Sequence, residues 1–330
     1  MIRPVTLFTG QFADIPIKEL APKAAKWGYE GLELACWGDH LNVDLAAKDM
    51  NYVKTHLKML KSYGLNVFSI SNHLAGQLVC DPNDDSRSDM FAPKEYHGQP
   101  EGKRKWAIQT MLNTAKAAKN LGVEIVNGFT GSSIWHMIYS FPPVSDETIE
   151  NGFQYFAKMW NPIFDEFDKN GIKFALEVHP TEIAFDIITA KRALKAVNYR
   201  KTFGFNFDPS HLYWQMLNPA KFLQIFSDRI YHTHMQDAAI TLDGESGILG
   251  SHLNFGTYGR GWDFRSLGRG DINFEEIIRT LNRINYKGPL SVEWEDAAMD
   301  REFGATEGCK FVKDLQFNVS DRVFDEAFGE

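Results

Sequence analysis

The sequence contains little cysteine. Only Cys36, Cys80 and Cys309 occur among 330 residues, and they are widely spaced and odd in number. A disulfide framework or a cysteine-based zinc site requires more cysteines at closer spacing. We therefore expect a protein of a reducing compartment.

The sequence also lacks a long apolar run and a targeting signal. Residues 1–9 do not show the basic start, long apolar stretch and small-residue cleavage site of a signal peptide. No later apolar run is long enough to span a bilayer. We expect a cytoplasmic protein with no membrane partner.

Clusters of basic residues are missing as well. The chain has 35 Lys and Arg residues against 43 Asp and Glu residues, a formal net charge of −8, and no Lys/Arg run that would form a polyphosphate-binding surface. We therefore expect no nucleic-acid partner. The pair Gly268 and Gly270 lacks the preceding strand and following helix of a nucleotide-binding loop, which argues against a nucleotide cofactor.

What the sequence does contain is a repeated alternation of two patterns. Short apolar runs rich in β-branched and aromatic residues alternate with longer segments of helical period, such as Ile17, Leu20, Ala21 and Ala24. The predicted strands are residues 5–8, 31–35, 66–70, 124–127, 174–177, 203–207, 230–235 and 290–293. Eight βα units without an intervening linker predict an α/β fold, a (β/α)₈ TIM barrel that forms a single domain over residues 1–330.

Two connections are long for such a barrel. They run from residue 73 to about 104, after the third strand, and from 236 to 273, after the seventh. Both leave the carboxyl ends of strands, the face where barrel active sites assemble, so we expect them to roof the pocket. The second connection ends at Asn273, which with Glu276 resembles a capping box and predicts a helix start.

Four residues that suit a metal ion end four consecutive predicted strands. Glu177, Asp208, His234 and Glu293 lie at the carboxyl ends of strands five to eight. Each of them alone could be an ordinary solvated carboxylate or a satisfied histidine. Barrel strands bring these positions into one ring, however, where three carboxylates and an imidazole require a cation to neutralise them. We predict one divalent metal ion, Mn²⁺ before Mg²⁺, Co²⁺ or Zn²⁺, because the ligands are mainly oxygen atoms.

The neighbours of these residues carry a resemblance to a known family. They are Glu177-Val-His179-Pro, Asp208-Pro-Ser-His211, His232-Thr-His234, and Gly288-Pro289 leading to Glu293. With these motifs the chain resembles the sugar phosphate isomerase/epimerase family of the xylose-isomerase-like TIM barrel superfamily, and is similar to the ketose 3-epimerases, over nearly its whole length. The resemblance implies that Glu177 and Glu293 bind the metal and also exchange protons with the substrate. It implies that His211 contacts the substrate.

Further residues are weaker candidates for substrate contact. His179 and Glu182 follow Glu177 closely and could reach sugar hydroxyls, while His73 and Trp135 follow the third and fourth strands and could form a wall of the pocket. Packing explains Trp135 equally well. His232 shares the strand face of His234 one layer deeper in the barrel, where we expect a structural histidine.

The leading hypothesis is a metal-dependent sugar isomerase or epimerase that works through an enediolate. The alternative is a lyase that cleaves 3-oxo-glycosides at the same metal site, with a second subunit as a partner. A DNA-repair endonuclease of the same barrel would need more metal ligands and a basic surface, and a sugar-binding protein without activity would not require two such glutamates. We expect a carbohydrate substrate, which we favour without a phosphate group, and a homo-oligomer or a hetero-oligomer.

Overall fold

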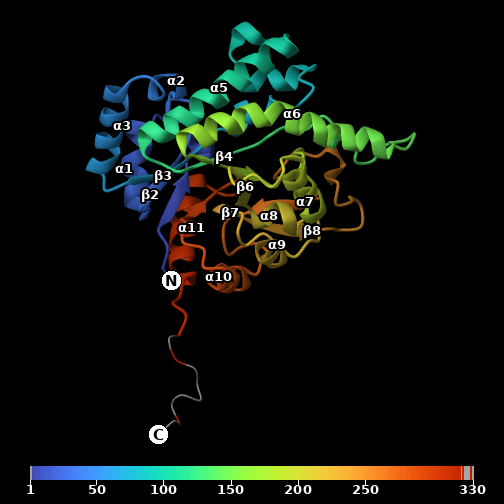
Figure 1. The fold of residues 1–330 in the computed structure, drawn as a ribbon. Coiled ribbons are helices and arrows are strands. Elements are labelled where there is room, and N and C mark those ends of the chain that lie inside the picture. Colours follow the sequence, from blue (N-terminus) through green and yellow to red (C-terminus); the bar gives the residue numbers. More distant parts are fainter. Residues whose placement is uncertain (1, 321, 323–327, 329–330) are drawn as a thin grey trace.

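Eight parallel strands form a closed barrel in the computed structural model, which describes residues 2–320, 322 and 328 (Figure 1). The barrel strands are β1 (Val5–Phe8), β2 (Gly31–Ala35), β3 (Asn66–Ser71), β4 (Ile125–Gly128), β5 (Lys173–Glu177), β6 (Phe203–Phe207), β7 (Ile230–Met235) and β10 (Leu290–Val292). Each pairs with its neighbours in sequence order, and β1 closes the ring against β10 with Val5 opposite Leu290. The predicted TIM barrel is therefore confirmed, and the predicted strands agree with the observed ones to within a residue.

Helices surround the barrel. They are α1 (Ile17–Trp27), α2 (Val43–Ala46), α3 (Met50–Ser62), α4 (His73–Gln77), α5 (Pro100–Leu121), α6 (Asp146–Asn170), α7 (Ile187–Ala196), α8 (Pro209–Tyr213), α9 (Pro219–Ile225), α10 (Phe274–Arg283) and α11 (Arg301–Leu315). Short 3₁₀ turns lie at Gly10–Phe12, Ser86–Phe91, Lys94–Tyr96, Trp135–Met137 and Gly250–His252. The long helices α5 and α6 run side by side across the barrel (Figure 1). No helix between residues 2 and 320 has the length and apolar character that a membrane crossing requires.

The core lies between the barrel and its helices. Alternate residues of a strand face opposite sides, so Phe203, Phe205 and Phe207 of β6 point outward to the helices. Trp160 and Phe164 of α6 meet this layer from the other side, with the Phe164 and Phe203 rings 5.4 Å apart. Residues at the intervening positions face the barrel interior, and this alternation turns the polar side chains of the strands toward the centre of the ring.

The connection after β7 contains a hairpin that the sequence pattern did not reveal. Strand β8 (Asp237–Thr241) pairs antiparallel with β9 (Gly261–Arg265), where a long loop was predicted. The carboxylate of Asp237 holds the base of this hairpin, because it accepts hydrogen bonds from the backbone N–H groups of Gly268 (3.0 Å) and Gly270 (2.9 Å). Asn273 caps α10 as predicted, since its side chain accepts from the N–H of Glu276 at 3.1 Å.

The connection after β3 is fastened to the barrel by two basic residues of α5. Lys103 is 1% exposed; its ammonium lies 2.5 Å from Asp89 and donates to Ser88 at 2.7 Å. Arg104 donates to the backbone carbonyl groups of Val79 (3.2 Å) and Asp81 (2.7 Å). A buried ammonium is tolerated only where such partners surround it. Segment 79–89 therefore has a fixed position over the mouth of the barrel.

Replacing Lys103 by Met should release this segment. The change removes the buried ammonium that pairs with Asp89 and donates to Ser88, and we expect a loss in the free energy of unfolding. Urea denaturation would measure the loss, and amide hydrogen exchange should rise most in residues 82–96. Lys105→Met changes an exposed lysine of the same helix and serves as the control. Equal exchange in the two variants would contradict the anchoring role.

Candidate active site

Four side chains from four neighbouring strands meet at the carboxyl end of the barrel. Glu177, Asp208, His234 and Glu293 each offer one ligand atom, and these atoms all lie within 4.8 Å of one another. The Nδ1 atom of His234 lies 2.6 Å from Oε2 of Glu293, 3.2 Å from Oε2 of Glu177 and 3.9 Å from Oδ2 of Asp208. The strand order β10-β7-β6-β5 explains the meeting, because it places the four strand ends side by side on one arc of the ring.

The donor set fits a divalent cation. The buried atoms without a hydrogen-bond partner among the described residues include three of this cluster, which are Nδ1 of His234, Oδ2 of Asp208 and Oε2 of Glu293. Buried polar atoms are normally satisfied, so several unsatisfied ones facing one point indicate a missing ligand. Three carboxylate oxygens and one imidazole nitrogen are ligands that Mg²⁺, Mn²⁺, Co²⁺ and Zn²⁺ accept in proteins.

The electrostatics of the cluster show the same need for positive charge. Burial, together with the charges of Glu177 and Glu293, raises the pKa of Asp208 to about 7. Burial alone would lower the pKa of His211, but the charges of Asp208 and Glu177 outweigh it and raise this pKa to about 9. Without a cation the protein must therefore hold extra protons here, which a bound metal ion would displace.

Glu33 of β2 is a buried carboxylate that the sequence analysis missed. It is fully buried inside the barrel, and it accepts hydrogen bonds from Nε2 of His232 (2.7 Å) and Nε2 of His234 (3.0 Å). Ser71 and Asn127 complete its partners. Burial raises the pKa of Glu33, but the neighbouring histidines outweigh this effect and hold it well below its usual value. The sequence did contain a signal for Glu33, because it is a charged residue within the apolar run 31–35.

The contact with Glu33 fixes the ring of His234. With Nε2 donating to Glu33, the other nitrogen, Nδ1, is free to face Glu177, Asp208 and Glu293. Metal-binding histidines commonly have such a carboxylate on the far nitrogen, which sets the tautomer and the orientation of the ring. Glu33, His232 and His234 also lie close enough to hold a cation themselves. Their mutual hydrogen bonds use the atoms that would bind it, so we assign them a structural role.

Glu177 and Glu293 are each held from a different side. The carboxylate of Glu177 lies 2.9 Å from Nε2 of His73 and 3.1 Å from Nε2 of His211, and it accepts from Asn206 at 3.2 Å. Glu293 accepts from the side-chain amide of Gln11 at 2.6 Å. His73 and His211, both predicted to contact substrate, therefore lie directly against one of the two glutamates.

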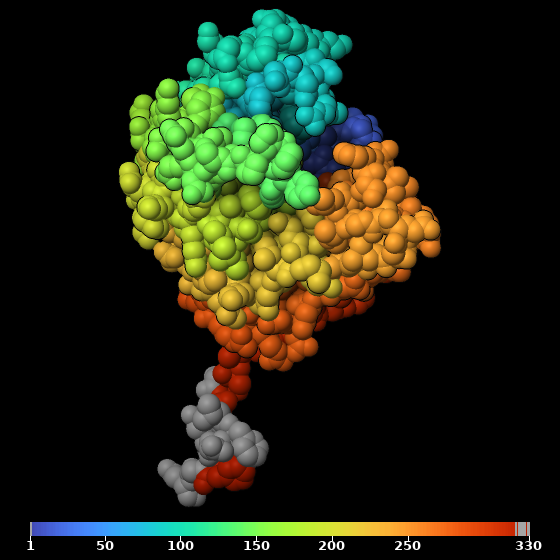
Figure 2. Space-filling model, turned by 90° about the vertical axis from the view of Figure 1, so that its right-hand side faces the viewer, coloured from blue at the N-terminus to red at the C-terminus, as the bar shows by residue number. Residues whose placement is uncertain are grey.

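Three loops that leave the carboxyl ends of barrel strands surround a hollow. Figure 2 shows the hollow between the segments coloured cyan, green and orange, which are the connections after β3, β4 and β7. The expected roof over the barrel mouth is thus made of three connections. A groove of about 660 Å³ runs between the first two, with His179, Phe129 and Trp135 among its lining residues. His179 packs against His211 with a ring separation of 4.1 Å, which places the groove beside the cluster.

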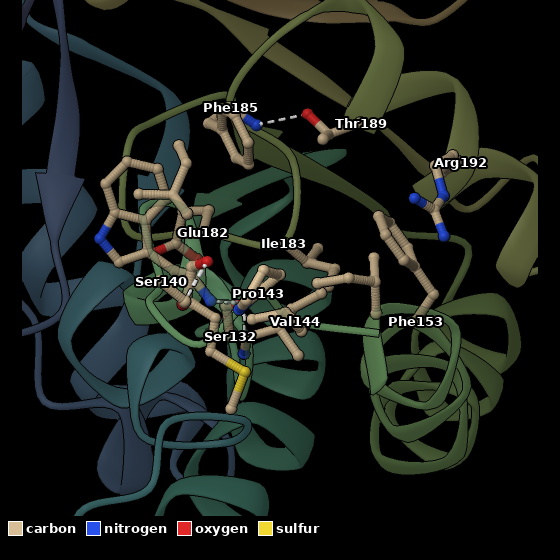
Figure 3. Close-up of a pocket in the computed structure, with 15 residues that line it drawn as sticks. Ser132, Ser140, Pro143, Val144, Phe153, Glu182, Ile183, Phe185, Thr189 and Arg192 are labelled. Carbon is tan, nitrogen blue, oxygen red and sulfur yellow. Dashed lines mark hydrogen bonds between the residues drawn. The ribbon is translucent and has the colours of Figure 1, made fainter. Parts of the chain in front are cut away.

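Glu182, which we expected to reach sugar hydroxyl groups, joins two loops. One carboxylate oxygen accepts from the backbone N–H groups of Thr130 (2.6 Å) and Gly131 (2.7 Å), and the side chain is fully buried. Burial raises its pKa to about 8, an effect that the charge of Asp81 adds to and these hydrogen bonds oppose. Glu182 thus ties the loop after β5 to the loop after β4. Figure 3 shows it at one side of an apolar cavity of about 420 Å³, which also contains Phe153.

The comparison with known families matches this architecture. A family model described as "Xylose isomerase-like TIM barrel" covers residues 21–315. Among curated proteins, the uncharacterized protein YfiH of Bacillus subtilis is 23% identical over 322 residues, 92% of this chain and 96% of YfiH. Inosose dehydratase of Clostridium beijerinckii is 33% identical over 110 residues, 33% of this chain and 36% of the dehydratase.

Solved structures share the fold at low sequence identity. The probable 3-DHS dehydratase AsbF of Bacillus anthracis has a TM-score of 0.65 at 20% identity, covering 93% of this chain and 97% of its own. The 3-keto-D-glucoside 4-epimerase YcjR of E. coli has a TM-score of 0.65 at 14% identity, covering 94% and 99%. The protein IOLI, whose structure holds a zinc atom, has a TM-score of 0.61 at 17% identity, covering 94% and 96%.

Asp208→Asn should lower metal affinity. Asparagine keeps the helix cap that Asp208 provides to the N–H of Ser210 but removes the charged ligand oxygen. Loss of a direct ligand should exceed the roughly 10–100-fold weakening typical of outer partners. Metal content after dialysis and titration calorimetry with Mn²⁺ would measure it. His211→Ala removes a neighbour of Glu177 outside the ligand set, and equal metal content in the two variants would refute the assignment.

Glu182→Gln should change the pH dependence of stability. The folded protein keeps this carboxyl group protonated up to a pKa of about 8, whereas the usual value is 4.5. Below pH 4.5 the carboxyl group is protonated in both the folded and the unfolded protein, and it costs no stability. As the pH rises from 4.5 to 8, only the unfolded protein releases the proton, so the free energy of unfolding falls by up to about 1.4 kcal/mol per pH unit. Glutamine does not titrate, so the variant should gain stability relative to the wild type between pH 5 and 8 in urea denaturation. Glu147→Gln, at an exposed carboxyl group, is the control. Curves of unfolding free energy against pH that run parallel in the wild type and in Glu182→Gln would contradict this expectation.

Proposed function

The chain belongs to the xylose isomerase-like TIM barrel family, and from this premise we propose that it is a divalent-metal-dependent sugar isomerase or epimerase. In this proposal the reaction passes through an enediolate, with Glu177 and Glu293 as acid and base. The observation that carries it is the position of these two carboxylates, both within reach of the same buried point from opposite ends of the four-strand arc.

The reaction begins with loss of a proton from a carbon next to a carbonyl group. A carboxylate suits this step when it is ionised and held in place. Burial raises the pKa of Glu177, but the charge of His234 and the contacts with His211 and His73 outweigh it and hold this pKa well below its usual value. Glu177 is therefore a fixed, ionised base. A bound divalent cation would stabilise the negative oxygens that the lost proton leaves behind.

The second step returns a proton. Glu293 reaches the cluster from the end of β10, whereas Glu177 reaches it from β5, and β7 and β6 lie between them. Two carboxylates that approach from different sides could remove a proton from one face of a carbon and deliver one to the other, which inverts that carbon. Gln11 holds one oxygen of Glu293 at 2.6 Å and leaves the other oxygen directed at the cluster.

The remaining contacts support a polar substrate. His211 and His73 border Glu177 and have N–H groups that could orient substrate oxygens, and His179 and Trp135 line the adjoining groove. For the resident metal ion we propose Mn²⁺, because three of the four ligand atoms are oxygen. The zinc atom in the similar IOLI structure makes Zn²⁺ the next ion to test.

A lyase is the second candidate. Two dehydratases are among the similar proteins, and elimination starts from the same loss of a proton beside a carbonyl group. It differs in the next step, in which a neighbouring oxygen substituent leaves and needs a proton. His211, whose pKa is raised to about 9, could donate that proton. On this reading the substrate is a 3-oxo-glycoside, and a second subunit could complete the pocket.

The test is exchange of substrate protons with D₂O. Mn²⁺-loaded protein with a panel of ketoses, aldoses and 3-oxo-glucosides should incorporate deuterium at one carbon and accumulate an isomer, both visible by NMR. Glu293→Gln should lower this exchange at least about 100-fold, the usual contribution of a general acid or base. Glu275→Gln, at an exposed carboxyl group of α10, is the control. Normal exchange in Glu293→Gln would refute the two-base proposal, and release of an aglycone or water would favour the lyase.

A further inference from the structure

We infer that the substrate is a neutral glycoside rather than a free sugar or a sugar phosphate, and that the groove between the connections after β3 and β4 binds the second, unreacting unit. This inference rests on the proposed function for the reacting ring, which lies at the metal cluster. The groove itself is assigned from its position, size, charge and lining.

The groove lies one side-chain layer from the reacting centre. His73 and His211 contact Glu177 directly, and two groove residues pack behind them. The ring of Phe129 lies 4.6 Å from that of His73, and the ring of His179 lies 4.1 Å from that of His211. A ring bound at the cluster would therefore have its substituent beside this groove.

The groove provides room for a ligand outside the reacting site. Its volume is about 660 Å³, and none of the four cluster residues is among the residues that line it. Pockets for molecules of several rings measure roughly 300–1,000 Å³, so the groove alone can take a further sugar unit. In Figure 2 the cyan and green segments, which supply most of the lining residues, both border the hollow. A free monosaccharide at the cluster would leave this volume unused.

The charge of the groove opposes an anionic substrate. Asp81, Asp84 and Asp85 line it, against a single guanidinium, that of Arg87. Arg87 is already engaged, because its Nε donates to Asp85 at 2.9 Å. The buried Lys103 nearby is directed at Asp89. A phosphate group needs unpaired basic groups or free backbone N–H groups, so a phosphorylated substrate would be repelled here.

The lining combines an aromatic ring with hydrogen-bond acceptors, as sugar recognition requires. Trp135 is half-buried, lines the groove and offers an apolar ring to the C–H face of a sugar. The exposed carboxylates of Asp84 and Asp85, which also line the groove, offer acceptor oxygens to sugar hydroxyl groups.

The groove is also preformed. Asp81 accepts a hydrogen bond from the backbone N–H of Ser132 at 2.9 Å, which joins the two connections across the floor. Arg104 fastens the first connection to α5, and Glu182 fastens the second to the loop after β5. Binding of a second sugar unit therefore costs little ordering of the protein.

The test compares four keto sugars with the Mn²⁺-loaded protein. These are 3-oxo-glucose, its 6-phosphate, and disaccharides (cellobiose and maltose) oxidised at the same carbon of the non-reducing ring, with kcat/KM for deuterium exchange as the readout. Because remote contacts contribute to transition-state binding, we expect a disaccharide to exceed 3-oxo-glucose at least about tenfold and the phosphate to be the poorest substrate. Exchange of 3-oxo-glucose or its phosphate as fast as that of the disaccharides would overturn the inference.

Variants of Trp135 test whether the preference for disaccharides arises in the groove. Trp135→Ala should lower the ratio of disaccharide to monosaccharide kcat/KM about tenfold, and Trp135→Phe should restore most of it because the ring remains. Tyr139→Ala changes a 93% exposed residue of the same connection outside the groove lining and is the matched control. An unchanged ratio in Trp135→Ala would place the second unit elsewhere and refute the groove.

A binding experiment separates this inference from the proposed reaction. Calorimetric titration with unoxidised cellobiose, maltose and glucose requires no turnover. If no sugar exchanges deuterium, binding of a disaccharide that Trp135→Ala weakens would support the groove and remove the support for the isomerase. Absence of disaccharide binding together with absence of a disaccharide preference would overturn the groove and leave the metal site unaffected.

Discussion

The site at the mouth of this barrel depends on one imidazole ring. His234 donates from Nε2 to the fully buried carboxylate of Glu33, and this contact turns Nδ1 toward Glu177, Asp208 and Glu293. The buried carboxylate of Glu33 and the three carboxylates at the strand ends thus share one histidine, which has an acidic neighbour at each ring nitrogen. Because isolated buried charges are expensive, the carboxylates can stay ionised only with protonated histidines or with a cation among them. The four strand ends bring these charges together, and a metal ion is one of the two ways to balance them.

The closed barrel explains how this charge can be tolerated. Its outer layer of aromatic side chains, such as Phe164 against Phe203, supplies apolar burial that is separate from the polar interior. Several of the interior polar side chains are paired with one another, as Glu33 is with His232 and Asn127. The connections above add a second set of fixed polar contacts, in which Glu182 and Asp81 hold backbone N–H groups of the loop after β4. Rigid loops over a rigid ring give a preorganised site.

The similar proteins include an epimerase and dehydratases. In the proposed mechanism both kinds of reaction would begin with removal of a proton beside a carbonyl group, and the groups around that carbon would decide the outcome. Specificity would then depend on the connections above the barrel, which include the hairpin of β8 and β9. The groove beside His179, which acidic and aromatic residues line, is formed by the connections after β3, β4 and β5.

The sequence by itself determined the strands and the ring of four residues. Strands such as Val5–Phe8 and Phe203–Phe207 have a local apolar pattern, and Glu177, Asp208, His234 and Glu293 are recognisable because each ends such a run. The family resemblance came from the same positions. Only the tertiary structure decided the partners of the buried polar groups. Glu33 lies within an apolar run and pairs with residues about 200 positions away, and Glu182 binds backbone N–H groups of another connection. The physical reason is the distance along the chain over which each feature is determined. Apolar periodicity depends on residues that are close in sequence, whereas the hydrogen-bond partner of a buried charge depends on which strands and loops the closed barrel brings together.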